Sequence, residues 1–76
     1  MFHENDAVKL KHNIPANSPT AWQGAPSVDL ASGDIGTIVM VYTNDSILYE
    51  YEVEFVDNDG MTCGLLRLKE EEIEPI

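Results

Sequence analysis

The sequence has few of the residues on which several classes of protein depend. It contains one cysteine and four basic side chains in 76 residues, against fourteen acidic ones. One cysteine excludes an internal disulfide, and four cations give too few phosphate contacts for nucleic acid or an anionic membrane surface. The longest apolar run, residues 38–42, is far shorter than the ~20 residues of a membrane-spanning helix. We therefore expect a protein that binds neither nucleic acid nor membranes.

What the chain does contain is enough apolar content for one small core. Hydrophobic residues make up 43% of it, which separates it from disordered acidic segments, and its length allows a single domain over residues 1–76.

The formal net charge of −10 favours a protein partner with a basic surface. Cys63 is expected to be a free, buried or half-buried thiol, and residues 1–6 lack the features of a secretory signal. Both observations predict a cytoplasmic protein.

Alternating apolar and polar residues predict an all-β chain. Four strands are predicted, with a short fifth, and the four are residues 6–11, 35–42, 49–55 and 61–68. Residues 57–60, Asp-Asn-Asp-Gly, predict a tight hairpin turn, and residues 43–46 predict another turn. Gly36 predicts a bulge or a close backbone approach, and Gly64 predicts a bulge. Small all-β proteins hide their strand edges by curling, so we expect a small antiparallel barrel.

The segment 49–55 has the most regular pattern in the sequence. Its odd-numbered side chains are aromatic or aliphatic and its even-numbered ones are glutamates, namely Tyr49, Tyr51, Val53 and Phe55 against Glu50, Glu52 and Glu54. Successive side chains of a strand point to opposite faces, so the first set is predicted to fill the core and the second to face water.

Two other segments have no such alternation. Residues 11–34 are interrupted by proline, glycine, asparagine and serine, which predicts one long first loop with a brief helical or extended piece at 28–31. Residues 69–76 predict a single helical turn begun by three glutamates. Ile73 and Ile76 are predicted to anchor this tail on the sheet.

Several stretches together resemble a family of small bacterial proteins known as a domain of unknown function. They are residues 33–39 (Gly-Asp-Ile-Gly-Thr-Ile-Val), Tyr49 or Tyr51 with 52–55, Asp57 with 60–62, and 68–75. The resemblance implies an SH3-like barrel and brings no catalytic residues with it. Residues 20–24, which include Trp22, look like an insertion relative to that family. The strand entered through Gly33 and Gly36 also resembles the KOW element of ribosomal proteins, whose basic residues are missing here.

Metal ligands and catalytic residues are not predicted. Residues 57–60 match only the middle of a calcium-binding loop, because Phe55 and Leu66 stand where that loop needs acidic side chains. His3 and His12 have no third ligand at a useful spacing. No nucleophile motif and no phosphate-binding loop occur, so no cofactor is expected either.

The candidate binding residues are carboxylates and aromatics. Glu50, Glu52 and Glu54 lie on one face with ~6.6–7 Å between successive glutamates, which suits a strip that docks Lys or Arg side chains. Nothing in the sequence predicts the burial that acid–base catalysis by these carboxylates would need. Tyr42 and Trp22 are the aromatic side chains available to a partner, and Trp22 lies in the polar loop, as an interface anchor or as a cap over the barrel end.

These observations favour a non-catalytic, acidic protein-interaction module, in a sharper form the accessory or neutralising subunit of a two-gene pair. One alternative is a ligand-binding or enzymatic barrel that uses the long loop as a lid over its mouth. A second is a KOW-like module associated with nucleic acid, which the charge disfavours.

Overall fold

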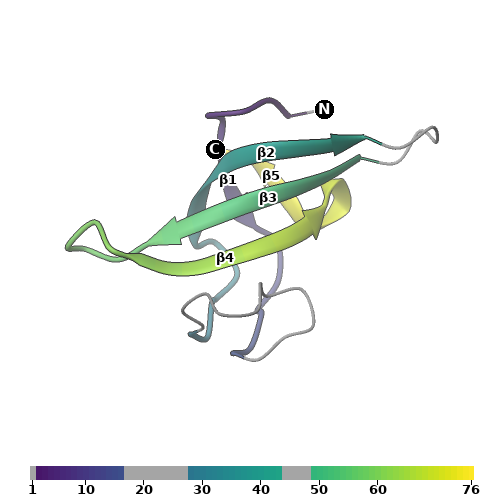
Figure 1. The fold of residues 1–76 in the computed structure, drawn as a ribbon. Helices are drawn as coiled ribbons and strands as arrows, with labels where there is room; N and C mark the ends of the chain where they lie inside the picture. The colour runs from purple at the N-terminus through teal and green to yellow at the C-terminus, as the bar shows by residue number, and fades with distance from the viewer. Residues whose placement is uncertain (1, 17–27, 44–48) are drawn as a thin grey trace.

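The computed structural model of the chain describes residues 2–16, 28–43 and 49–76. They form an antiparallel sheet whose strand order is β4-β3-β2-β1-β5, drawn in Figure 1. The elements are β1 (Ala7–Leu10), β2 (Ile35–Thr43), β3 (Tyr49–Val56), β4 (Thr62–Lys69), the 3₁₀ turn η1 (Glu70–Glu72) and β5 (Ile73–Pro75). The described residues are thus all-β, with five antiparallel strands in one sheet and one 3₁₀ turn, which agrees with a small antiparallel barrel. The predicted fold class is therefore confirmed.

The core consists mostly of side chains from the inner faces of these strands. Tyr51, Val53 and Phe55 of β3 are buried, as their alternation predicts. Val8 and Leu10 of β1 are also buried, again as predicted. Each large apolar side chain removed from water contributes about 1.5–3 kcal/mol before entropy is counted. Among the described residues, the buried hydrophobic side chains are Val8, Leu10, Ile14, Leu30, Ile38, Tyr51, Val53, Phe55, Leu66, Leu68 and Ile73.

Glycine residues set the closest approaches and the turns. A Cβ atom on Gly36 would lie 2.7 Å from Cγ1 of Val53 and 2.8 Å from Cε1 of Phe55, so β2 can cross the core here only without a side chain. The hairpin between β3 and β4 turns at Gly60, where φ is +79°. The Asp57 carboxylate accepts hydrogen bonds from two backbone N–H groups of this turn. The predicted close approach and hairpin are both confirmed.

Two bulges change which side chains face outward. The pairing of β2 with β3 shifts between Ile38 and Met40, which leaves Val39 as an extra residue. The bulge in β2 therefore lies three residues beyond Gly36. Past it, Val41 packs against the core and Tyr42 lies opposite Glu50. In the pairing of β3 with β4, the extra residue is Cys63, next to the glycine that predicted a bulge there.

The segment 11–34 is less loop-like than predicted. Ile14 and Leu30 form an antiparallel bridge in which each backbone N–H donates to the carbonyl of the other at 2.8 Å. Both side chains are buried in the core. The bridge adds to the predicted loop a single backbone pair between apolar residues, and Leu30 lies within the piece at 28–31 for which an extended conformation is one of the two predictions. Residues 17–27, and with them Trp22 and the inserted stretch, lie outside the described residues.

The C-terminal segment agrees with its prediction in part. The three glutamates form η1, and Ile73 is almost completely buried. Ile76 is 67% exposed, so its predicted role as a second anchor is wrong. The physical reason is strand alternation: Ile73 and Ile76 are three residues apart in extended chain, so they point to opposite faces.

The hydroxyl of the buried Tyr51 connects three parts of the chain. The Tyr51 hydroxyl donates to Oε1 of Glu70 at 2.6 Å and accepts from the backbone N–H of Phe2 at 3.1 Å. Burial raises the pKa of Tyr51, and the hydrogen bond to Glu70 raises it further. This contact joins the N-terminal segment and η1 to β3.

Among the described residues, no helix has the length and apolar character needed to cross a membrane.

Candidate protein-interaction surface

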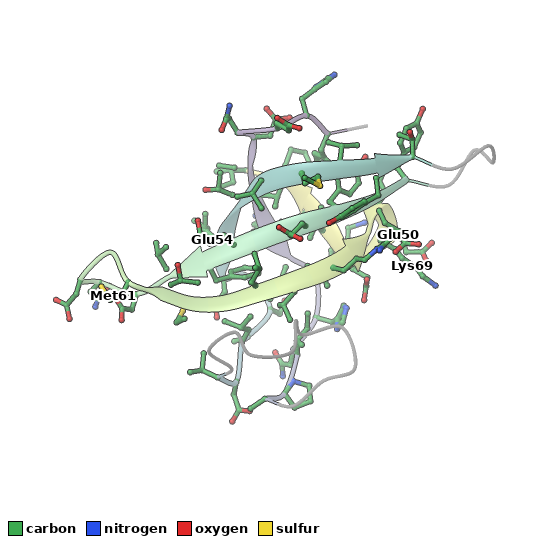
Figure 2. All side chains as sticks on the ribbon, in the orientation of Figure 1. Glu50, Glu54, Met61 and Lys69 are labelled. Atoms are coloured by element: carbon green, nitrogen blue, oxygen red, sulfur yellow. The ribbon has the colours of Figure 1, made fainter. Side chains whose placement is uncertain are left out.

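The candidate surface is the side of strands β2, β3 and β4 that faces away from the core. We call it the outer face and define it by Met40, Tyr42, Glu50, Glu52, Glu54, Thr62, Leu65, Arg67 and Lys69. The strand register aligns Tyr42, Glu50 and Lys69 in one row and Met40, Glu52 and Arg67 in the next. Figure 2 shows Glu50 and Lys69 near one end of this face, with Glu54 on the side of the hairpin that carries Met61. Three neighbouring strands therefore contribute to one surface.

At the Glu50 end, a cation is held between a carboxylate and an aromatic ring. Nε of Arg67 lies 2.8 Å from Oε1 of Glu50, and the guanidinium carbon of Arg67 lies 4.2 Å from the centre of the Tyr42 ring. Arg67 is opposite Glu52 in the register, so its side chain reaches diagonally to Glu50. The charge of Glu50 is thus compensated within the chain.

The other two glutamates of the row are held by groups that carry no charge. The Tyr42 hydroxyl donates to Oε1 of Glu52 at 3.0 Å, and the Thr62 hydroxyl donates to Oε2 of Glu54 at 2.6 Å. A hydroxyl fixes the position of a carboxylate but brings no positive charge to it. Each of these hydrogen bonds uses one carboxylate oxygen. Glu52 and Glu54 are therefore oriented, and neither has an ion-pair partner among the described residues.

The Tyr42 phenol is suited to remain a donor. Desolvation raises the pKa of Tyr42, and the hydrogen bond to Glu52 and the charge of that carboxylate raise it further. The positive charge of Arg67 acts in the opposite direction. A phenol whose pKa lies above its ordinary value of about 10 stays protonated at neutral pH and keeps its hydrogen bond to Glu52.

Apolar side chains border the acidic row. Met40 is 44% exposed on β2, and Leu65 on β4 is half-buried beside Glu54. Val39, the bulge residue, is also exposed. The outer face therefore combines exposed apolar area with charged side chains.

Four of the five candidate residues predicted from the sequence come together here. Tyr42, Glu50 and Glu52 form one hydrogen-bonded and ion-paired group, and Glu54 follows on the same strand. The glutamates lie on the face opposite the core, as the alternation predicts, and their neighbours leave them half-buried. Sequence reasoning missed the hydroxyl of Thr62 and the stacked Arg67, since their positions depend on the register between β3 and β4.

Two of the three acids of η1, Glu70 and Glu72, have structural roles instead. Oε2 of Glu72 accepts the backbone N–H of Lys69 at 2.7 Å, and its other oxygen lies 3.3 Å from Nε2 of His12. Glu70 accepts the Tyr51 hydroxyl, as described above. Within the three described stretches, no group of three or more His, Cys, Asp or Glu side chains is arranged to hold a metal ion. Cys63 is free and half-buried against the core.

Comparison with family models gives a match over residues 4–75, nearly the whole chain, to a domain of unknown function, DUF4926. The chain belongs to the DUF4926 family. This confirms the resemblance to a family of unknown function. Comparison of this DUF4926 member with curated proteins and with solved structures gives no match. The family description assigns no activity, so the function of this DUF4926 chain has to be argued from its own geometry.

Proposed function

We propose that the chain is a non-catalytic protein-interaction module whose outer face docks a basic segment of a protein partner. The observation that carries this proposal is the pair Glu52 and Glu54, which uncharged hydroxyls hold in place. Their side chains have lost part of their freedom before any partner arrives. A Lys or Arg side chain of the partner then gains a charge-assisted hydrogen bond at a smaller entropic cost.

The charge of the whole chain supports the same partner chemistry. Fourteen carboxylates against four basic side chains give a net charge of −10. Such a field accelerates encounter with a basic protein and disfavours acidic ones. The exposed side chain of Met40 adds apolar contact beside the carboxylates. In its sharper form, the proposal makes the chain the accessory or neutralising subunit of a two-gene pair with a basic partner.

The test compares two double substitutions that change the net charge equally. Glu52→Gln with Glu54→Gln removes the oriented carboxylates, and Glu4→Gln with Glu71→Gln removes two exposed acids elsewhere. Tagged versions of the wild type and both variants are expressed in the native host, crosslinked briefly and captured, and the captured proteins are quantified by mass spectrometry. We expect a basic protein that the wild type and the control retain, and that the outer-face variant loses by about tenfold or more.

Two results would contradict the proposal. If both variants lose the protein equally, only overall charge attracts it and the outer face has no special role. If neither variant loses it, the partner docks elsewhere on the chain. Raising the salt concentration weakens the wild-type interaction on this proposal, because the contacts are ionic and partly exposed.

A further inference from the structure

The Arg67 side chain shows which kind of cation the outer face accommodates. Its guanidinium lies 4.2 Å from the centre of the Tyr42 ring, and its Nε lies 2.8 Å from Oε1 of Glu50. Oε1 of Glu52 is held at the hydroxyl of the same ring. A guanidinium thus already lies on an aromatic face and contacts one carboxylate, Glu50, while a second carboxylate, Glu52, lies at the hydroxyl of the ring.

This combination suits arginine better than lysine. A guanidinium is planar and weakly hydrated, so it stacks on an aromatic face while its N–H groups donate to carboxylates in the same plane. An ammonium is compact and strongly hydrated, and it cannot make both contacts with one flat group. The two carboxylates carry two negative charges, and Arg67 compensates one of them.

The Arg67 contact is exposed enough to exchange. The side chain of Arg67 is 43% exposed and that of Glu50 is 33% exposed. Ion pairs and cation–π contacts at such exposed positions are weak. Arg67 reaches the ring diagonally across the strands, so its flexible side chain has room to extend into solvent when released.

We propose that Tyr42, Glu50 and Glu52 form an arginine-binding site that Arg67 occupies in the unbound protein and that an arginine of the partner takes over on docking. This inference rests on the proposed function and deepens it, since it names the partner side chain and the residue that competes with it. Arg67 then lowers the affinity for the partner and favours arginine over lysine, because a bound lysine does not replace the stacking contact.

The experiment uses hexaarginine and hexalysine as probes and two charge-matched variants. Arg67→Met removes the competing side chain, and Lys9→Met removes one positive charge from an ion pair with Glu74 on β1 and β5. Thermal unfolding of both variants checks that they fold. Side-chain NMR follows the Nε–H signal of Arg67, and calorimetry gives the affinity.

We expect hexaarginine to shift the Arg67 Nε–H signal of the wild type toward that of a solvent-exposed arginine, and hexalysine to shift it much less. Arg67→Met is expected to bind hexaarginine up to about fivefold more tightly than Lys9→Met does. Equal affinities of the two variants, an unchanged Arg67 signal during binding, or no binding of hexaarginine would each overturn the inference.

The two proposals fail separately. If Glu52→Gln with Glu54→Gln abolishes peptide binding while Arg67→Met and Lys9→Met behave alike, the outer face still binds basic segments and only the exchange is wrong. If the same double substitution leaves hexaarginine binding unchanged, the proposed function itself is contradicted.

Discussion

Gly36 occupies a position on β2 where no side chain fits. Its backbone passes so close to β3 that a Cβ would meet Val53 at 2.7 Å, Phe55 at 2.8 Å and the carbonyl oxygen of Glu54 at 3.0 Å. The backbone oxygen cannot move without disturbing the pairing of β2 with β3, which places Thr37 opposite Glu54. The backbone of the paired strands therefore excludes a side chain at Gly36, and neighbouring side chains cannot relieve this by moving alone.

Gly36→Ala is expected to lower the free energy of unfolding by about 1–3 kcal/mol, because the added methyl overpacks the core. Gly64→Ala is the matched control: Gly64 is also buried, but its nearest neighbour, Cδ1 of Leu30, would lie 3.5 Å from the new Cβ, an ordinary contact. Urea denaturation of the two variants measures the difference. Equal stability of the two alanine variants would show that β2 and β3 separate at little cost.

Single residues also decide which parts of the outer face sequence reasoning could reach. The alternation in 49–55 correctly assigns Glu50, Glu52 and Glu54 to one face, because period two follows from strand geometry alone. The contact of Tyr42 with Glu52 depends on the extra residue Val39 in β2, and no local pattern marks that residue as a bulge. The hydrogen bond between the Tyr42 hydroxyl and Glu52 therefore could not be predicted from the sequence and required the structure.

At the scale of elements, the segment between β1 and β2 contributes to the core instead of merely connecting two strands. Ile14 and Leu30 form one isolated bridge, and Leu30 also lies under Gly64 of β4. A bridge of one pair has no periodicity, and the prolines and glycines around it predict a loop. The sequence consequently predicts the strands β1 to β4 well and allows an extended piece at 28–31, but it does not predict that Leu30 pairs with Ile14.

Leu30→Ala is expected to cost about 2–3 kcal/mol, since it leaves a cavity between the bridge and β4. Val28→Ala, two residues away at a position that is 44% exposed, is expected to change stability by less than about 0.5 kcal/mol. Chemical denaturation of both variants checks this difference. If the Leu30 variant is as stable as the Val28 variant, the Leu30 side chain contributes little to the stability of the core, which contradicts the prediction.

At the scale of the whole molecule, charge opposes compactness. Fourteen carboxylates and four cations share a chain of 76 residues. Two of the cations are in ion pairs with carboxylates, Lys9 with Glu74 at 3.6 Å and Arg67 with Glu50 at 2.8 Å. Both pairs are partly exposed to solvent, and such pairs contribute about 0–1 kcal/mol each. Because fourteen carboxylates outnumber four basic side chains, repulsion among the carboxylates of the chain exceeds the attraction that these two pairs supply.

The salt dependence of stability shows whether attraction in the ion pairs or repulsion among the carboxylates is larger. Salt weakens both, so stability rises with salt if the repulsion is larger and falls if the ion pairs contribute more. We expect the free energy of unfolding to rise by about 1 kcal/mol between about 0.02 M and about 0.5 M sodium chloride, as screening reduces the repulsion. Urea denaturation is the suitable measurement, since urea is uncharged. The double variant Glu4→Gln with Glu71→Gln makes the net charge less negative and changes neither ion pair, so its free energy of unfolding should rise less with salt. A fall in stability with salt would mean that the two ion pairs contribute more than all the repulsion, and the acidic field would then be too weak to attract a basic partner in the way proposed.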